Sequence, residues 1–238
     1  RVIAYPAVDL REGACVQLVG GDYAAERVRV ADVVGQARAF REAGFTRLHV
    51  VDLDAATGRG DNAALVDRLI GESGLRVQVG GGVRTEERAA ELLERGADRV
   101  IVGTRAVEDA AFRERLASRF PDRIVVALDV REREVVVRGW ASGAGQAVTS
   151  LATEMAGLPL AGLLVTAVHR EGALGGADHS LYRELKGATS APLFASGGVG
   201  SLDDLRSLAS AGVAGVVIGM ALYTGAVDAT QVAREYGG

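Results

Sequence analysis

The stretches VQVGGGVRTEERAAELLERGADRVIVGTRAV, residues 77–107, and LFASGGVGSLDDLRSLASAGVAGVVIGMALY, residues 193–223, align without a gap. Each has the pattern of a strand, a glycine turn, an amphipathic helix, a second strand and a closing glycine. The offset of 116 residues (197 − 81) pairs Gly81 with Gly197, Gly82 with Gly198, Val83 with Val199, Leu92 with Leu208, Gly96 with Gly212, Val100 with Val216 and Gly103 with Gly219. All strand–helix units are somewhat alike, but glycine matches along the whole stretch favour an internal duplication.

Short apolar runs alternate with helix-like stretches along the whole chain. The runs are rich in Val, Ile, Leu and Ala without strict polar alternation, which is typical of parallel strands buried on both faces. Strands are expected at residues 2–9, 47–52, 76–80, 99–102, 123–129, 161–166, 192–196 and 215–218. Eight strands alternating with helices predict βαβ units that close into a barrel. We therefore predict an α/β protein with one domain, residues 1–238, folded as a (β/α)8 TIM barrel built from two duplicated half-barrels.

The segments between the strands carry helix signals. Thr85 and Ser201 are each followed by acidic residues, which predicts a capped helix start at both positions. Residues 207–227 lack charged side chains over a length that could cross a bilayer. Their four glycines and their place in the duplication instead predict a helix end, a buried strand and a phosphate loop.

The composition is that of a globular protein, with 48% hydrophobic and 24% charged residues. The 31 acidic and 27 basic residues give a net charge of −4, so we expect no nucleic-acid partner, because phosphate backbones bind to basic surfaces. Cys15 is the single cysteine and is expected to pack in the core without a disulfide. Charged residues interrupt the N-terminal apolar run, so we expect a cytoplasmic protein with no secretory signal and no membrane contact.

Glycines recur where a strand ends and a helix begins, at residues 80–82 and 196–198. Glycine lets the backbone approach an anion closely, and a helix N-terminus supplies free N–H groups. Residues 103–104 and 219–220 end the following strands and complete each cradle in this interpretation. The alternative is that the glycines only make tight turns. Two cradles related by the duplication favour an extended substrate with a phosphate at each end.

Asp9 and Asp129 each lie at the carboxyl end of a predicted strand, half a barrel apart. That end of a TIM barrel carries the chemistry, and two carboxylates facing each other can act as general base and general acid. A structural ion pair is the alternative. His49, His169 and His179 lack metal-ligand spacing and no cysteine cluster accompanies them, so no metal is expected. The sequence also lacks a dinucleotide fingerprint and a G-x-S-x-G elbow.

Five motifs together resemble the phosphoribosylformimino-aminoimidazole carboxamide ribotide isomerases of histidine biosynthesis. They are PAVDL at residues 6–10, LHVVDLD at 48–54, VQVGGGVR at 77–84, RGW at 138–140 and ASGGV at 195–199. The resemblance covers nearly the whole chain. It implies an Amadori rearrangement, in which an aminoaldose becomes an aminoketose without cofactor or metal. The expected partner is a small-molecule bisphosphate substrate, and we expect a monomer.

The resemblance also implies roles for individual residues. Asp129 would be the acid that assists furanose ring opening, and Asp9 the base that takes the proton from C2′ of the resulting imine. Thr166 matches a threonine near the reacting sugar, and Trp140 a tryptophan that stacks on the imidazole. Further substrate contacts would be Arg138 and Glu171; one phosphate would lie at Gly82, Gly103 and Thr104, and the other at Gly172, Gly198, Gly219 and Met220.

The chain departs from the family pattern after the sixth strand. Ala167 lacks a carboxylate, Glu171 carries one on a longer side chain than the usual aspartate, and Ala173 lacks a hydroxyl. Three alternative functions follow from such details. One is a dual-substrate isomerase that also converts phosphoribosyl anthranilate, although Gly80 replaces a serine common there. The second is the related cyclase subunit of imidazole glycerol phosphate synthase, whose lysine is Gln17 here. The third is a catalytically impaired phosphosugar-binding barrel.

Overall fold

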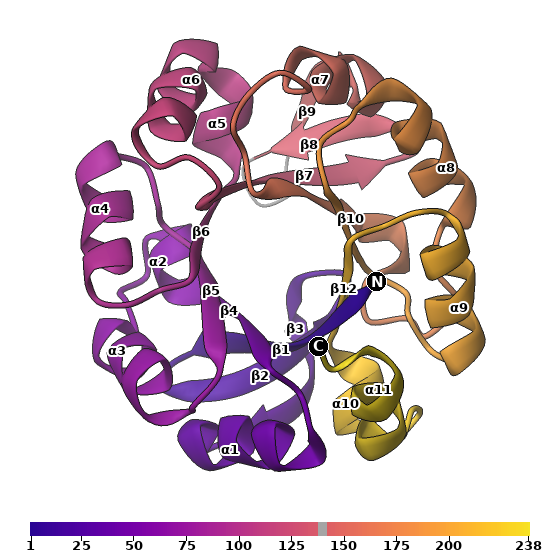
Figure 1. Cartoon of the computed structure of the whole chain (residues 1–238). Helices are drawn as coiled ribbons and strands as arrows, with labels where there is room; N and C mark the ends of the chain where they lie inside the picture. The colour runs from indigo at the N-terminus through magenta and orange to yellow at the C-terminus, as the bar shows by residue number, and fades with distance from the viewer. Residues whose placement is uncertain (138–141) are drawn as a thin grey trace.

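The computed structural model describes residues 1–137 and 142–238. Eight parallel strands form a closed barrel, in which each strand pairs with the next and β12 pairs with β1 (Figure 1). The strands are β1 (Ile3–Arg11), β4 (Arg47–Asp52), β5 (Arg76–Gly80), β6 (Arg99–Val102), β7 (Ile124–Arg131), β10 (Gly162–Ala167), β11 (Leu193–Ser196) and β12 (Gly215–Ile218). The predicted (β/α)8 barrel is confirmed, and β4, β5, β6 and β12 have the predicted bounds.

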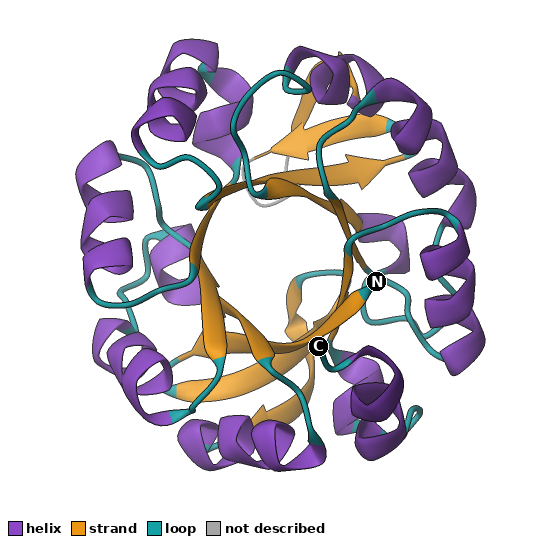
Figure 2. Cartoon of the chain, viewed as in Figure 1, coloured by secondary structure: helices purple, strands orange, loops and turns teal. Residues whose placement is uncertain are grey.

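An outer ring of helices surrounds the barrel (Figure 2). The helices are α1 (Val33–Ala43), α2 (Leu53–Thr57), α3 (Ala63–Glu72), α4 (Glu86–Glu94), α5 (Thr104–Glu108), α6 (Ala110–Arg119), α7 (Val148–Glu154), α8 (His179–Ala188), α9 (Leu202–Ser210), α10 (Met220–Tyr223) and α11 (Ala229–Tyr236), with a 3-10 turn η1 (Val168–Arg170). The expected starts at Thr85 and Ser201 are confirmed, because each hydroxyl accepts a hydrogen bond from the backbone N–H three residues on.

Two antiparallel hairpins extend the barrel and were not predicted. β1 continues into β2 (Ala14–Val19) and β3 (Asp22–Val30), and β7 continues into β8 (Glu134–Val137) and β9 (Ser142–Ala147). The hairpins occupy equivalent places in the two halves, since Asp9 pairs with Val16 and Asp129 with Val136. Cys15 in β2 is fully buried, as predicted. The closing glycines of the two aligned stretches also have nearly the same backbone conformation. The angles φ and ψ are −101° and −114° at Gly103 and −103° and −102° at Gly219.

The barrel is filled at one end and hollow at the other. A large apolar layer lies between the strands and the helices and includes Val8 and Leu128, both fully buried. A smaller layer fills the barrel interior and consists of Tyr5, Ala7, Ile101, Val125, Ala161, Leu164, Phe194 and Val217. At the carboxyl ends of β5, β6 and β12 the chain carries a glycine, at Gly80, Gly103 and Gly219. These three glycines line an open cavity.

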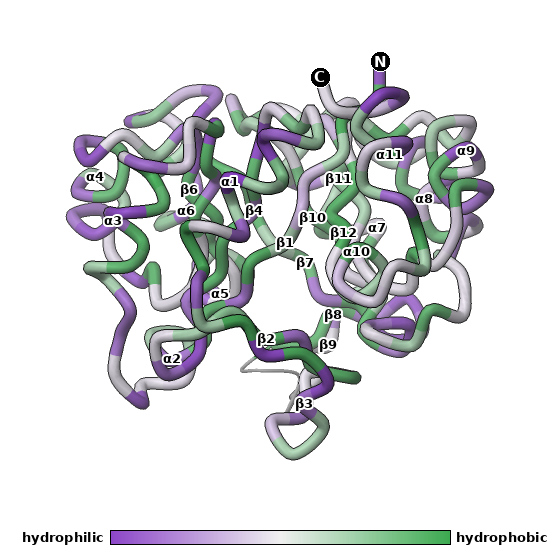
Figure 3. Tube along the Cα trace, turned by 90° about the horizontal axis from the view of Figure 1, so that it is seen from below, coloured by the Kyte–Doolittle hydropathy of each residue, from purple (hydrophilic) through white to green (hydrophobic). Residues whose placement is uncertain are grey.

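The hollow end is the one from which the hairpins project. Figure 3 shows β2 and β3 beyond the barrel at that end and both termini at the opposite end. The uncharged residues 207–227 form the end of α9, the buried strand β12, the turn at Gly219 and α10. The predicted helix end and buried strand are confirmed. Within the described residues no helix is long and apolar enough to cross a membrane.

The start of α9 offers a test of how the helices are capped. The Ser201 hydroxyl accepts from Asp204 N at 3.2 Å, and the Asp204 carboxylate accepts from Ser201 N at 3.0 Å. Ser201→Ala should lower the free energy of unfolding by about 1 kcal/mol, because it removes the hydroxyl that satisfies the free N–H group of Asp204 in the first turn. The measurement is urea unfolding. Ser207→Ala in the same helix is the control and should change it by less than about 0.5 kcal/mol; equal losses in both variants would contradict the capping role.

Candidate active site

A cavity of about 970 Å³ opens at the carboxyl ends of the barrel strands. All predicted site residues within the described part of the chain line it: Asp9, Asp129, Thr166, Glu171, Gly82, Gly103, Thr104, Gly172, Gly198, Gly219 and Met220. Arg138 and Trp140 lie outside the described residues. The structure thus brings the predicted residues together in one place, and their individual roles remain predictions.

Asp9 and Asp129 come from opposite sides of the barrel. Asp9 lies on β1 and Asp129 on β7, which are four strands apart in either direction around the ring. Burial raises the pKa of Asp9 to about 7, because the barrel wall removes water from the charged form. A carboxyl group with such a pKa exchanges a proton near neutral pH, as general acid–base catalysis requires.

Glu171 is a third carboxyl group in the same cavity. Burial, together with the nearby negative charges of Asp9 and Asp129, raises its pKa to about 8. Its Oε2 is buried and has no hydrogen-bond partner among the described residues. Glu171 therefore holds a proton at neutral pH, and the cavity avoids three adjacent negative charges.

The first glycine cradle lies between β5 and β6. Gly81 has φ +100°, and a Cβ there would lie 2.2 Å from the Asp52 carbonyl oxygen, so only glycine fits this turn. Gly103 is different, because a Cβ there would meet its nearest neighbour at 4.0 Å and would project into free space. Arg84 and Arg105 also line the cavity on this side, and they supply positive charge beside the cradle.

The second cradle lies between β10, β11 and β12 and is closed by the β2–β3 hairpin. A Cβ on Gly172 would lie 2.4 Å from the Leu18 carbonyl oxygen, and Gly20 N donates to the Glu171 carbonyl oxygen at 3.1 Å. Gln17 is 3% exposed and its Nε2 has no partner among the described residues. Its Oε1 lies 2.3 Å from where a Gly219 Cβ would be. A neutral amide thus stands beside this cradle.

A buried amide fixes the turn that follows Asp9. Asn62 Nδ2 donates to Asp52 at 2.8 Å and to Asp54 at 2.9 Å, and its Oδ1 accepts from Gly13 N at 2.9 Å. Asp54 also accepts from Glu12 N at 2.7 Å. The β1–β2 turn is therefore anchored to the end of β4, which holds Asp9 and Gln17 in place.

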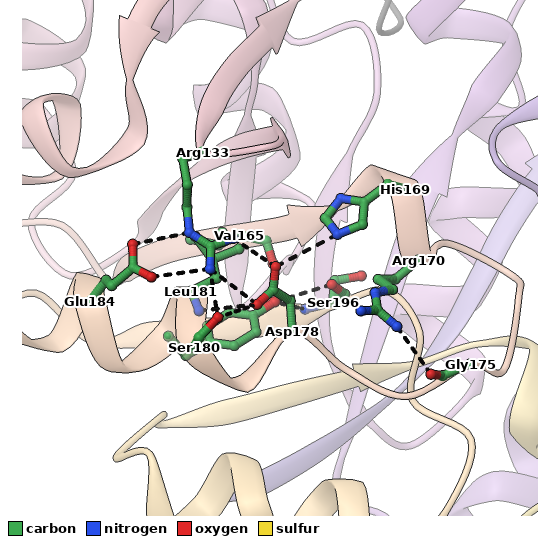
Figure 4. A network of polar contacts seen from close by, with 11 residues as sticks. Arg133, Val165, His169, Arg170, Gly175, Asp178, Ser180, Leu181, Glu184 and Ser196 are labelled. Atoms are coloured by element: carbon green, nitrogen blue, oxygen red, sulfur yellow. Dashed lines mark hydrogen bonds and ion pairs between the residues drawn. The ribbon is translucent and has the colours of Figure 1, made fainter.

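A second polar network positions the loop that carries Glu171 (Figure 4). Arg133, in the β7–β8 turn, donates to Asp178 at 2.7 Å and to Glu184 at 3.0 Å. Asp178 caps α8 and lies 3.6 Å from His169 Nε2. Arg133 lies in the turn that follows the strand of Asp129, and Asp178 lies at the end of the loop that carries Glu171. The network therefore connects the turn after Asp129 with the loop of Glu171.

Sequence reasoning missed several polar residues that line the cavity. They are Gln17, Tyr23, His49, Arg84 and Arg105. Gln17 and Tyr23 belong to the unpredicted hairpin, and the two arginines follow glycines that were recognised. In the described part of the chain, no group of three or more His, Cys, Asp or Glu side chains is placed to hold a metal ion.

Comparison with known proteins identifies the family. The model of the family described as "Histidine biosynthesis protein" matches residues 3–228. The chain belongs to this family. It is 56% identical over 236 residues, 99% of this chain and 100% of the relative, to a protein of Gemmatimonas aurantiaca named 1-(5-phosphoribosyl)-5-((5-phosphoribosylamino)methylideneamino)imidazole-4-carboxamide isomerase. Proteins with the same name from Myxococcus xanthus and Synechococcus elongatus are 54% and 44% identical, over 100% and 98% of this chain and 100% and 92% of their own lengths.

In this member of the histidine biosynthesis family, the buried Glu171 should cost stability at high pH. Folding raises its pKa from 4.5 to about 8, so the stabilising effect of its bound proton is full below pH 4.5 and is lost as the pH rises through about 8. Glu171→Gln, which stays neutral, should therefore be more stable than the wild type at pH 8.5 by about 2 kcal/mol. This value is smaller than the full pKa shift corresponds to, because the Glu171 side chain is partly exposed and solvent weakens the effect.

Chemical unfolding at pH 8.5 and pH 5 tests this expectation. The advantage of Glu171→Gln should shrink strongly at pH 5, where the wild-type carboxyl group is already protonated. Glu94→Gln on the outer face of α4 is the matched control and should behave alike at both pH values. A pH-independent effect of Glu171→Gln would show that its carboxyl group is not buried as described.

Proposed function

We propose that this protein catalyses the isomerisation for which its relatives are named. Its substrate would be the bisphosphorylated 1-(5-phosphoribosyl)-5-((5-phosphoribosylamino)methylideneamino)imidazole-4-carboxamide, and its product the corresponding aminoketose. The observation that carries the proposal is one cavity in which Asp9 and Asp129 face each other between two glycine cradles. The 56% identity to a protein of that name over 99% of this chain supports it. The reaction would be a cofactor-independent aldose–ketose isomerisation within histidine biosynthesis.

The proposed chemistry needs one acid and one base. Asp129 protonates the furanose ring oxygen, and the C1′–O bond breaks while the nitrogen lone pair forms an iminium ion. The Asp9 carboxylate then removes the C2′ proton, which gives an enaminol and a neutral nitrogen. Asp9 returns that proton to C1′, and the 2′-hydroxyl proton restores Asp129 as the C2′ carbonyl forms. Atoms balance without any other reactant, and Asp9, with a pKa of about 7, can both take and return a proton.

The two cradles would hold the two ends of the substrate. Gly82, Gly103 and Thr104 lie on one side of the cavity, and Gly172, Gly198, Gly219 and Met220 lie on the other. A ligand that spans both binds its second phosphate at a high effective concentration, because the first contact already holds it in place. Thr166 and Glu171 would contact the reacting sugar, and Arg138 and Trp140 the rest of the substrate. We further propose that the protein works as a monomer in the cytoplasm, with this small molecule as its partner.

Substitution of the two aspartates tests the mechanism. Asp9→Asn and Asp129→Asn should each lower kcat by about 10²–10⁴-fold, because a positioned acid or base contributes that much. In the wild type, kcat/KM should rise as the pH passes through about 7, where Asp9 loses its proton to become the base. The measurements are steady-state kinetics from pH 5 to 9 and equilibrium binding of the bisphosphate product.

Product affinity is the control, since neither aspartate belongs to a phosphate cradle, and it should change by only a few-fold. A variant that keeps wild-type turnover would remove its residue from the mechanism. The same assay with phosphoribosyl anthranilate tests dual specificity. Asp61 and Asn62 resemble the dual-substrate isomerases, but the resemblance implies a serine at Gly80 and an aspartate at Glu171. We therefore expect weak or no turnover of this second substrate. Efficient turnover of both substrates would replace the proposal by the dual-substrate function.

Gly103 offers a clean test of the first cradle. A methyl group there meets no atom closer than 4.0 Å, whereas a Cβ on Gly82 would lie 2.9 Å from Ala55. Gly103→Ala should therefore leave the fold intact but weaken binding of the bisphosphate product by at least about tenfold, the equivalent of 1.4 kcal/mol. Isothermal titration calorimetry measures this. Gly157→Ala, on a surface loop with no neighbour within 4 Å, is the control; equal affinities of the two variants would place the phosphate elsewhere.

A further inference from the structure

His49 lies in the cavity below Asp9 and has no part in the chemistry described so far. On neighbouring strands, Ala7 pairs with His49 and Asp9 with Val51, so His49 is one inward-facing layer deeper than Asp9. The side chain is 6% exposed and lines the cavity. Burial lowers the pKa of His49 to about 4, so the ring is neutral at physiological pH.

Gln78 sets which ring nitrogen carries the hydrogen. Gln78 Nε2 lies 2.8 Å from His49 Nδ1, and an amide nitrogen can only donate. His49 Nδ1 therefore accepts, and the neutral ring carries its hydrogen on Nε2. Among the described residues Nε2 has no hydrogen-bond partner, and since the ring lines the cavity, this N–H is available to a ligand.

The duplication shows that the fold does not need this polar pair. In the first half, Ala7, His49 and Gln78 lie side by side on β1, β4 and β5. In the second half, the equivalent neighbours on β7, β10 and β11 are Ala127, Leu164 and Phe194. Leu164 and Phe194 belong to the apolar interior of the barrel.

The polar pair also has a cost, because Gln78 is 1% exposed and its Oε1 has no partner among the described residues. A buried polar group that lacks a partner destabilises a protein by roughly 1–3 kcal/mol. One half of the barrel thus carries a costly pair where the other carries an apolar one. Function, rather than packing, accounts for the difference.

We propose that His49 is a further catalytic residue, whose neutral imidazole donates a hydrogen bond from Nε2 to the 2′ oxygen of the reacting sugar. This inference rests on the isomerase function proposed above. The 2′ oxygen gains electron density as its proton leaves and it becomes the carbonyl oxygen of the ketose. A fixed neutral donor stabilises that oxygen without giving up its own proton. Gln78 is a positioning residue that keeps the donor hydrogen on Nε2.

The double substitution His49→Leu with Gln78→Phe tests the proposal, because it copies the apolar pair of the other half. The free energy of unfolding should stay the same or increase, since no buried polar group remains without a partner. In contrast, kcat should fall by about 10²–10³-fold, as expected for the loss of one donor to a developing negative charge. KM and product affinity should change by only a few-fold. His49→Gln, which keeps a neutral donor, should recover at least about a tenth of the wild-type kcat.

Nitrogen-15 NMR of the wild type gives a readout that does not depend on any variant. His49 should show hydrogen on Nε2 and no titration between pH 5.5 and 8, with His169 and His179 as internal references. Hydrogen on Nδ1, or a double variant that retains wild-type kcat, would overturn the role of His49. A loss confined to KM would also overturn it, because it would make His49 a binding residue only. A wild type without isomerase activity would instead refute the proposed function itself. The two failures are distinguishable, because the NMR readout on His49 does not depend on activity.

Discussion

The site depends on the absence of side chains at the carboxyl end of the barrel. Inside a small eight-stranded barrel, inward-facing side chains normally fill the whole interior. Here Tyr5, Leu164 and Phe194 fill it only at the end that holds the chain termini. Gly80, Gly103 and Gly219 leave the other end open, so that a cavity of about 970 Å³ reaches down to the first buried layer. The predicted site residues within the described part of the chain all line this space.

The same closed wall produces the unusual acidities of the site. Burial in the barrel disfavours charge, which raises the pKa of Asp9 and Glu171 and lowers that of His49. A buried group of this kind either stays neutral or, where the pH forces it to be charged, lowers the free energy of unfolding. Asp9 with a pKa of about 7 can alternate between both forms, whereas Glu171 and His49 remain neutral donors near neutral pH. Burial is thus the main cause that separates a proton-exchanging group, Asp9, from the two groups that stay neutral.

The barrel and the position of its two aspartates could be predicted because they depend on local patterns. Buried strands appear in the sequence as apolar runs, and the glycine turns of the first half recur 116 residues later in the second half. The β2–β3 hairpin could not be predicted, because β3 alternates exposed and half-buried residues without a clear apolar face. The contact of Gln17 with Gly219 requires barrel closure, and the pairing of His49 with Gln78 requires the register between β4 and β5. Such contacts join residues that are distant in sequence, and no local pattern encodes them.

The two halves of the barrel share a backbone but differ at the positions that face the ligand. Strand register makes Gln17 equivalent to Val137, and Val51 equivalent to Thr166. Arginines accompany the first cradle, while a neutral amide accompanies the second. A symmetric site would bind the proposed substrate equally well in two orientations, although only one of its two sugars reacts. Because the backbone cradles are nearly identical, the unequal side chains must select the orientation that brings the reacting sugar between Asp9 and Asp129.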